Sequence, residues 1–406
     1  MEVIKGGVTA AKGFKAVGIY AGIKKKRKDM ALVYSVVPAK SAGTFTTNIV
    51  KAAPVKWDIK LIKEYETASA VVLNSGVANA CTGAEGEINN KRMAEAMASN
   101  LNVSANSVLT CSTGVIGKQL PIDVITVGTK LLAEKMEESI EAGTMAAEAI
   151  MTTDTYSKEY AVNIQIGDKV ITIGGMAKGS GMIHPNMATM LGVVTTDISI
   201  SKALLQEAIS ANVKETFNMI SVDRDTSTND SLIILANGLA GNKEITEKNK
   251  EYDKFCKALK VVTTNLAKKM AADGEGATKL FETIVIGAES KEQAVTLSKS
   301  IITSNLVKTA VYGNDANWGR ILCAMGYSGA DFDPDKVDLF IESVVGKIKL
   351  VENGMAANYS EEYATKILSA KEVTAIADVK MGNETATAWG CDLTYDYVKI
   401  NADYRS

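Results

Sequence analysis

Strand-like and helix-like patterns alternate along the whole chain, and this alternation restricts the possible fold more than any other feature of the sequence. Short apolar runs such as Met30–Val36 and Val71–Asn74 are typical of buried strands. Segments with helical periodicity lie between such runs, and Ser201–Phe217 is the clearest of them. Only five prolines occur, and no low-complexity linker interrupts the pattern. The alternation therefore predicts layered α/β packing, in which helices cover sheets.

The same patterns predict individual elements. Lys15–Tyr20 and Met30–Val36 are expected to form a hairpin, and the basic run Lys24–Lys28 is expected to be its solvated tip rather than a polyanion-binding patch. Further strands are expected at Val108–Cys111, Val170–Ile173, Val193–Thr196, Phe281–Ile286, Lys308–Tyr312, Val337–Ile341, Val345–Val351, Thr385–Leu393 and Tyr397–Asn401. Further helices are expected at Asn90–Asn100, Leu131–Ala149 and Tyr252–Ala272, and after a capping box formed by Ser290 and Gln293.

The composition excludes several classes of protein. Of the 406 residues, 46% are hydrophobic and 23% are charged, which excludes wholesale disorder. The net charge of −2 lacks the basic excess of a nucleic-acid-binding surface. Charged residues interrupt the first fifteen positions, where a signal peptide needs an apolar stretch, and no run is long enough to span a membrane. We therefore expect a soluble cytoplasmic protein that binds neither nucleic acid nor a membrane.

The reactive side chains restrict the chemistry further. His184 is the one histidine, so a multi-histidine metal site cannot form within one chain. The five cysteines contain no CxxC pair and are expected to be reduced thiols. The acidic loop Asp223–Asp230 is not a calcium-binding EF-hand, since Thr228 and Ile234 stand where that loop needs glycine and glutamate. The residues therefore point to neither a multi-histidine metal site nor an EF-hand.

The glycine-rich segment Gly174–Gly192 is the most unusual stretch, with five glycines in nineteen residues between two strand-like runs. A phosphate-binding loop is one interpretation, but both the Walker pattern and the dinucleotide fingerprint lack a required residue here. A Ser–His–acid triad that uses His184 is a second interpretation, although no G-x-S-x-G elbow frames a serine. Neither interpretation is excluded by the sequence alone.

Self-cleavage is the third interpretation of this segment. Ala188–Thr189 places a small residue before a β-hydroxyl residue, and attack of the Thr189 hydroxyl on the Ala188 carbonyl would make Thr189 a new chain terminus. The freed α-amine has a pKa of about 7.7–8.0, so roughly a tenth is unprotonated at pH 7. It can therefore act as the base for its own hydroxyl, and no histidine is needed.

At this segment the chain resembles the ArgJ family, the glutamate N-acetyltransferases (ornithine acetyltransferases) of arginine biosynthesis. The resemblance covers essentially the whole chain, and its motifs stand in the family's order. They are Phe45–Asn48, Ala52–Val55, Asn74–Gly83, Ser112–Gly117, Met151–Thr155, Lys178–Gly192, Val222–Asp230, Asp273–Lys279, Gly313–Arg320 and Asn401–Ser406. The chain departs from the family's usual pattern at Val77, where asparagine is usual, and at Arg224, where glycine is usual.

The resemblance implies a role for each matching residue. Thr189 would be the nucleophile, released from Ala188 by self-cleavage into an α chain of residues 1–188 and a β chain of residues 189–406. Thr113 and Gly114 would form the oxyanion hole, although their residues alone also fit an ordinary turn. The positions that match the family's substrate-binding residues are Thr152, Lys178, Thr189, Glu275, Asn401 and Ser406.

The resemblance also implies the fold and the reaction. The fold would be a layered αββα-type α/β (α+β) fold of the DmpA/ArgJ kind, with lobes at 1–280 and 281–406. The reaction would be ping-pong transfer of an acetyl group from N-acetyl-ornithine to glutamate through an acetyl-threonine, without metal or cofactor, in an α2β2 heterotetramer. Acetyl-CoA is a second donor in some members, and the sequence leaves open whether it serves here. The alternative is an N-terminal-nucleophile amidohydrolase or aminopeptidase of the same fold.

Overall fold

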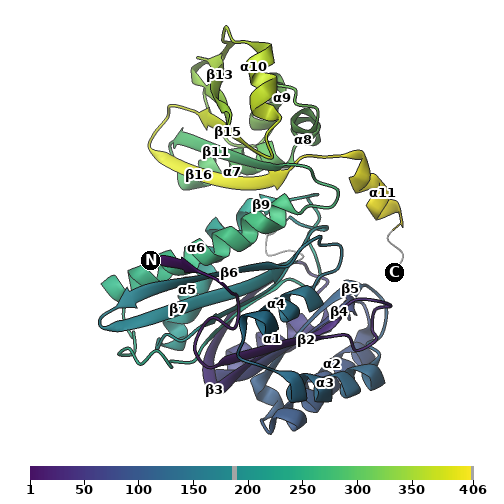
Figure 1. Cartoon of the computed structure of the whole chain (residues 1–406). Coiled ribbons are helices and arrows are strands. Elements are labelled where there is room, and N and C mark those ends of the chain that lie inside the picture. The colour runs from purple at the N-terminus through teal and green to yellow at the C-terminus, as the bar shows by residue number, and fades with distance from the viewer. Residues whose placement is uncertain (185–189, 404–406) are drawn as a thin grey trace. The chain divides into compact units, whose positions relative to one another are not determined.

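The computed structural model of the chain describes residues 1–184 and 190–403, and these form two compact units (Figure 1). The first unit comprises Met1–Asn218 and Asp225–Leu266, and the second comprises Met219–Arg224 and, among the described residues, 267–403. The chain passes from the first unit to the second within helix α6 (Lys250–Ala272), between Leu266 and Ala267. This point is earlier than the predicted lobe boundary near residue 280. The lobes 1–280 and 281–406 stay a prediction.

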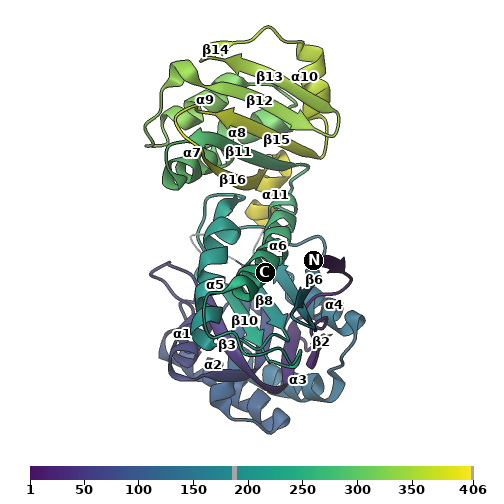
Figure 2. The ribbon, with the colours of Figure 1, turned by 90° about the vertical axis from the view of Figure 1, so that its left-hand side faces the viewer.

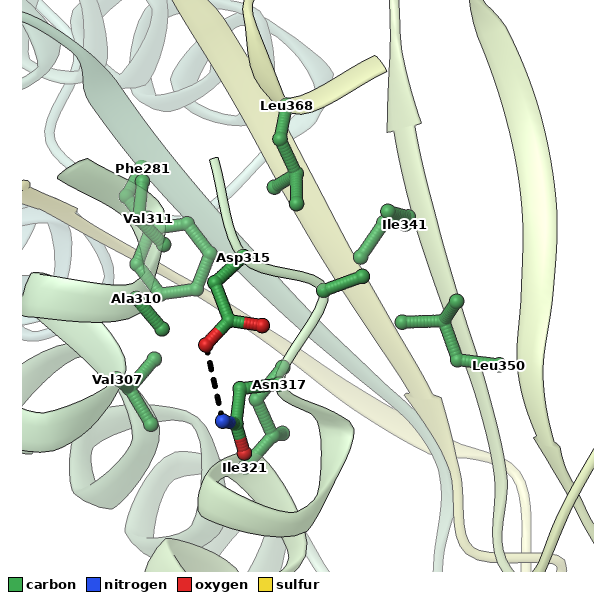
Figure 3. Close-up of a pocket in the computed structure, with 11 residues that line it drawn as sticks. Phe281, Val307, Ala310, Val311, Asp315, Asn317, Ile321, Ile341, Leu350 and Leu368 are labelled. Carbon is green, nitrogen blue, oxygen red and sulfur yellow. Dashed lines mark hydrogen bonds between the residues drawn. The ribbon is translucent and has the colours of Figure 1, made fainter. Parts of the chain in front are cut away.

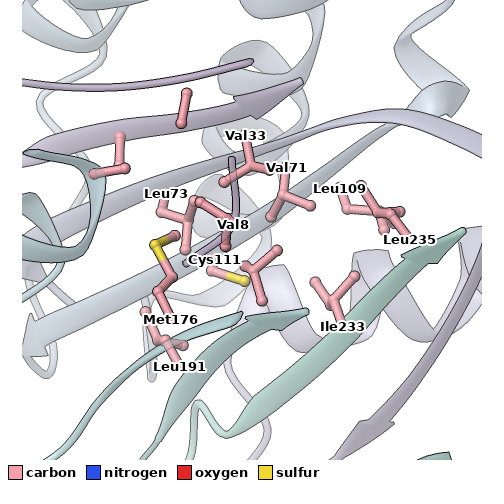
Figure 4. Packing of buried hydrophobic residues seen from close by; sticks show 14 of the residues in the cluster. Val8, Val33, Val71, Leu73, Leu109, Cys111, Met176, Leu191, Ile233 and Leu235 are labelled. Carbon is pink, nitrogen blue, oxygen red and sulfur yellow. The ribbon is translucent and has the colours of Figure 1, made fainter. Parts of the chain in front are cut away.

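The first unit contains one large mixed sheet that supplies two packed layers. Its strand order, among the described residues, is β1 (Glu2–Ile4), β6 (Lys158–Ile166), β7 (Lys169–Lys178), β8 (Leu191–Thr196), β10 (Ser231–Ala236), β3 (Met30–Phe45), β4 (Thr67–Val77) and β5 (Val108–Val115), and β2 (Phe14–Ile19) pairs with β3. The two halves of this sheet share one buried core. Figure 4 shows Val71 and Leu109 of one half on the same core as Met176 and Ile233 of the other.

Helices cover both outer faces of these strand layers. On one side α2 (Gly83–Leu101) and α3 (Ile122–Lys135) pack against β2–β5, with Met93, Met97 and Leu132 in a second buried cluster. On the other side α5 (Lys202–Glu215) contacts β3 and β10, and Figure 2 shows it beside α6 over these strands. The helices α1 (Ala53–Glu64) and α4 (Ile140–Ala149) add side chains to the central core. The expected layered α/β architecture is thus confirmed.

The second unit is a mixed sheet with helices packed on it. Its strand order is β14 (Met355–Ala356), β13 (Gly346–Glu352), β12 (Asp338–Ser343), β15 (Glu372–Asp378), β11 (Leu280–Ala288), β16 (Glu384–Cys391) and β9 (Ile220–Ser221). Helix α7 (Lys291–Thr303) packs on β11 and β16, and α10 (Glu361–Leu368) packs on β12. The predicted cap of α7 is confirmed, because the Ser290 side chain accepts a hydrogen bond from the Gln293 N–H.

Three predicted elements are wrong, each for a local reason. Lys308–Tyr312 belongs to helix α8 (Asn305–Tyr312), which Ser304 caps by accepting a hydrogen bond from the Val307 N–H. Tyr397–Asn401 lies in helix α11 (Tyr395–Asp403), where the Asn401 side chain bonds back to the Tyr397 carbonyl. Both runs are short and apolar, which is the pattern that fits a strand and a helix equally well.

The predicted helix Leu131–Ala149 is in fact two helices, α3 and α4. The break is stabilised by Ser139, which caps α4 by accepting a hydrogen bond from the Ala142 N–H. Glu137 in the connection exchanges two backbone hydrogen bonds with Ala16 of β2. The connection therefore behaves as an added edge of the sheet, which helical periodicity alone does not show.

Gly18 of β2 allows α4 to approach the sheet closely. A Cβ atom at this position would lie 1.8 Å from the carbonyl oxygen of Met145 in α4. We expect Gly18→Ala to lower the free energy of unfolding by about 3 kcal/mol, because the helix must move away from the strand. Chemical denaturation measures this, with Gly326→Ala of α9 (Trp318–Gly326) as the control, since no atom lies within 4 Å of a Cβ there. Equal stability of the two variants would contradict the close packing.

Candidate active site

The predicted oxyanion pair lies within strand β5, and not in the ordinary turn that its residues would also allow. Thr113 is 5% exposed, and Gly114 has a φ of +130°, which side chains rarely adopt. Gly114 lies opposite Gly76 in the parallel β4–β5 pair, and a Cβ on Gly114 would lie 2.3 Å from the Gly76 carbonyl carbon. Glycine is therefore required here, and it leaves the Gly114 backbone beside the Thr113 hydroxyl.

Three of the predicted site residues lie together in the first unit. The Lys178 ammonium, at the end of β7, donates hydrogen bonds to the Thr152 hydroxyl at 2.8 Å and to the Thr113 hydroxyl at 3.4 Å. Lys178 is only 2% exposed. We call Lys178, Thr113 and Thr152 the lysine–threonine cluster. It joins three motifs that are far apart in the sequence, and it sets a cation beside the predicted oxyanion donor.

Asp154 is a further residue of this site, which the sequence analysis did not identify. Its carboxylate accepts hydrogen bonds from the Lys158 ammonium and the Gly179 N–H, both at 2.7 Å, and from the Thr152 N–H at 3.1 Å. It also lies 3.9 Å from the Lys178 ammonium. Burial alone would raise the pKa of Asp154, but Lys178 and Lys158 hold the pKa far below its usual value. Asp154 is therefore an ionised, fully buried carboxylate.

The chain that follows the predicted cleavage point is anchored to the same region. The Met190 N–H donates to the buried Asp230 carboxylate at 2.7 Å, and burial raises the pKa of Asp230 well above its usual value. The neighbouring Asn229 side chain donates to the carbonyls of Ala78 at 2.6 Å and of Ser112 at 2.8 Å. The motif Val222–Asp230 thereby connects the start of β8 to the strand that carries the oxyanion pair.

Register in the β7–β8 ladder brings together residues that lie on either side of the predicted cleavage point. Lys178 and Leu191 are paired residues of these antiparallel strands. The predicted cleavage residues Ala188 and Thr189 lie outside the described residues, as does Ser406. Covalent continuity nevertheless keeps Thr189 within two residues of Leu191, the partner of Lys178.

The second unit holds the other two predicted substrate-binding residues. The Asn401 side-chain amide, in α11, donates to the Glu275 carboxylate at 2.7 Å. Glu275 is 8% exposed and lies between α6 and β11. This contact joins the motif Asp273–Lys279 to the described part of the motif Asn401–Ser406.

The two departures from the family pattern are accommodated locally. Arg224 has a φ of +72°, the left-handed conformation that glycine adopts without strain. Val77 is 8% exposed and lies at an irregular step of the β4–β5 pairing, opposite both Thr113 and Val115. Val77 thus contributes an apolar surface next to the oxyanion pair, where asparagine would contribute an amide.

The basic run Lys24–Lys28 is a solvated tip only in part. Lys26 and Arg27 are exposed, as expected, but the Lys24 ammonium donates to the Met151 carbonyl at 2.9 Å, directly before Thr152. Burial lowers the pKa of Lys24 from the ordinary 10.5 to about 8. The tip therefore supplies a half-buried cation at the edge of the lysine–threonine cluster.

Lys24 should give the stability of the protein a pH dependence in the alkaline range. Between a pH of about 8 and 10.5, the unfolded chain keeps a proton on Lys24 that the folded chain has released. The free energy of unfolding therefore gains a contribution that rises with pH over this range. Because Lys24→Met removes this contribution, the stability of the variant relative to wild type should decrease from about pH 7.5 to about pH 10. Urea denaturation at both pH values measures this, and a constant difference would contradict it.

Two pockets and the acidic and thiol groups of the described residues can be compared with this site. No group of three or more His, Cys, Asp or Glu side chains that could hold a metal occurs among the described residues. A cavity of about 10 Å³ in the second unit is too small for a substrate, and Figure 3 shows its mostly apolar lining beside a hydrogen bond between Asp315 and Asn317. A hollow of about 420 Å³ lies between α1 and α2 and contains none of the predicted site residues. None of the helices that the structure describes could span a membrane.

Comparison with known proteins gives consistent matches. The sequence model of the ArgJ family matches residues 15–406. The arginine biosynthesis bifunctional protein ArgJ of Caldanaerobacter subterraneus subsp. tengcongensis is 52% identical over 406 residues and covers 100% of both chains. A crystal structure of the protein of that name from Bacillus halodurans is 47% identical, with a TM-score of 0.50, over 52% of this chain and 98% of that one. A structure of ornithine acetyltransferase complexed with ornithine, from Mycobacterium tuberculosis, is 41% identical, with a TM-score of 0.43, over 47% and 98%.

Proposed function

This chain belongs to the ArgJ family of arginine-biosynthesis enzymes, the glutamate N-acetyltransferases, and we propose that it moves the acetyl group of N2-acetyl-L-ornithine to L-glutamate. The observation that carries the proposal is the lysine–threonine cluster at the end of β7. It unites Thr113, Thr152 and Lys178, and Lys178 pairs with Leu191, the first residue of β8. This cluster offers a hydroxyl donor and a buried cation to support the nucleophile that we propose at Thr189.

Self-cleavage is the first step of the proposal. The Thr189 hydroxyl attacks the carbonyl carbon of Ala188, and the peptide rearranges to an ester. Water then hydrolyses the ester, which releases the Ala188 carboxylate and leaves Thr189 with a free α-amine. The fact that the Bacillus halodurans chain is matched almost completely by half of this chain is compatible with a polypeptide that exists as two pieces.

Acetyl transfer follows in two half-reactions. The Thr189 amine takes the proton of its hydroxyl, whose oxygen attacks the acetyl carbonyl of N-acetyl-ornithine. The Thr113 hydroxyl and the Gly114 N–H stabilise the oxyanion, ornithine leaves with a proton, and an acetyl ester remains on Thr189. The amine of glutamate then attacks this ester, and N-acetylglutamate leaves. No metal or cofactor takes part in these steps.

The charged site residues suit amino-acid substrates. Lys178 is a partner for a substrate carboxylate, and Glu275 with Asn401 is a partner for an ammonium group. Thr152 holds Lys178 in place through its hydroxyl. Ser406, the last residue of the chain, completes the proposed substrate-binding set. We further propose that the protein forms an α2β2 assembly in the cytoplasm. We also propose acetyl-CoA as a second acetyl donor, since the curated relatives are named bifunctional.

The test separates transfer from hydrolysis. Purified protein is incubated with N-acetyl-ornithine alone, and then glutamate is added. We expect an acetyl adduct on the Thr189 fragment in an intact mass spectrum, and N-acetylglutamate only after glutamate is added. Continuous release of acetate without glutamate would instead favour the alternative, an N-terminal-nucleophile amidohydrolase. A single uncut chain without an adduct would contradict both.

A further inference from the structure

Asp154 is the acidic group at the centre of a cluster of buried amines. Lys158 and Asp154 are both 0% exposed in their side chains, and Lys178 is 2% exposed. Lys24 approaches from the hairpin tip and also interacts electrostatically with Asp154 and Lys178. Two buried lysines thus lie against the Asp154 carboxylate, and the half-buried Lys24 adds a third positive charge nearby.

Contacts of Asp154 reach both sides of the proposed active site. One carboxylate oxygen accepts from Lys158 and from the N–H of Gly179, the residue after Lys178. The other oxygen accepts from the Thr152 N–H and faces Lys178. Asp154 therefore fixes the backbone on either side of the Lys178–Thr152 hydrogen bond, and it is also the counter-charge of Lys178.

We propose that Asp154 is a positioning residue, which holds the Lys178 ammonium charged and directed at Thr113 and Thr152. The inference rests on the proposed acetyl transfer, in which Lys178 binds substrate. A buried ammonium without a nearby carboxylate loses its proton readily. Asp230 also interacts electrostatically with Lys178, and burial raises the pKa of Asp230 well above its usual value. Among the described residues, Asp154 therefore gives Lys178 a buried counter-charge at 3.9 Å.

Asp154→Asn removes the charge and keeps the shape of the side chain. We expect kcat/KM for N-acetyl-ornithine to fall by about 100-fold at pH 8, since one partner of a buried, hydrogen-bonded charge pair is lost. The loss should shrink as the pH is lowered towards 6, because Lys178 then regains its proton. Wild type should not gain activity over the same change of pH. The effect should lie mainly in KM, since Lys178 acts in binding.

A matched control is available at the other end of the same strands. Asp197 is 4% exposed and, like Asp154, accepts hydrogen bonds from two backbone groups, the N–H of Thr172 and of Lys12. Its interaction with the Lys12 side chain is electrostatic, and among the described residues no lysine ammonium is hydrogen-bonded to it. Asp197→Asn, like Asp154→Asn, replaces a carboxylate oxygen by an amide nitrogen, so both variants share any general loss of stability from that replacement. We expect it to retain wild-type KM and the wild-type pH profile.

A double-mutant cycle distinguishes positioning from a general structural role. If Asp154 acts through Lys178, then Asp154→Asn combined with Lys178→Met should have no lower activity than Lys178→Met alone. Additive losses, or an unchanged pH profile in Asp154→Asn, would overturn the inference. If Asp154→Asn fails to fold, Asp154→Glu is tested in its place. This variant keeps the negative charge, so a KM that changes with pH in Asp154→Glu would also overturn the inference. Failure of wild type to transfer acetyl would instead contradict the proposed function itself.

Discussion

Replacing Thr189 by alanine should leave the chain uncut and abolish acetyl transfer. Alanine has no hydroxyl, so neither the attack on the Ala188 carbonyl nor the formation of an acetyl ester can occur. We expect activity to fall by about 10⁴-fold or more, as for other covalent nucleophiles. Intact mass spectrometry should show one chain of residues 1–406 for the variant and two fragments, 1–188 and 189–406, for wild type.

Thr189→Ser is the matched control, because serine keeps the hydroxyl and the α-amine. It should still be cut and should retain measurable transfer. A wild-type protein that is fully active without being cut would refute the role of the new terminus. A Thr189→Ala protein that transfers acetyl would refute the nucleophile.

Replacing Gly114 by alanine should have the second largest effect, on both activity and stability. The new Cβ would lie 2.3 Å from the carbonyl carbon of Gly76 and 2.6 Å from its oxygen, in a backbone conformation with a φ of +130°. Strands β4 and β5 would have to separate, and the Gly114 N–H would leave its place beside Thr113. We expect kcat to fall by about 100- to 1,000-fold, the usual cost of one lost oxyanion donor.

The stability of Gly114→Ala should also fall, by about 3 kcal/mol, as measured by chemical denaturation. Gly117→Ala is the matched control in the same segment. Gly117 also has a positive φ, of +82°, but no atom lies within 4 Å of a Cβ there. It should therefore cost only about 1 kcal/mol and leave kcat close to wild type. Equal kcat values for the two variants would show that the close approach of Gly114 to Gly76 has no catalytic role.

The sequence predicted most long elements but not the short ambiguous ones. Helices α5 and α6 have an apolar face that repeats over several turns, so their periodicity is unambiguous. Helices α8 and α11 are too short for such a repeat, and each is stabilised by one side chain, Ser304 or Asn401, whose bond forms only in the helix. A pattern of apolar residues does not contain that information.

In the candidate site, too, some residues were predictable from the sequence and others were not. Thr113, Thr152, Lys178, Glu275 and Asn401 were predicted through family motifs, and the structure brings the first three together and the last two together. Asp154 lies within the motif Met151–Thr155, yet nothing in the motif distinguishes its role from that of an exposed acid. Lys24 was assigned to a solvated tip because an isolated run of charges is usually solvated. Only its burial and its contact with Met151 show otherwise.

The sequence by itself determined the family, the order of its motifs and the chemistry available to them, because these depend on which residue types are present and in what order. Tertiary structure decided which charges are buried and which of them face each other. In the sequence, the antiparallel strands β6 and β7 lie between Asp154 and Lys178, which is the last residue of β7. The distance of 3.9 Å between the Lys178 ammonium and the Asp154 carboxylate follows from the register of these strands. Register depends on the packing of the whole sheet, so no local segment specifies it.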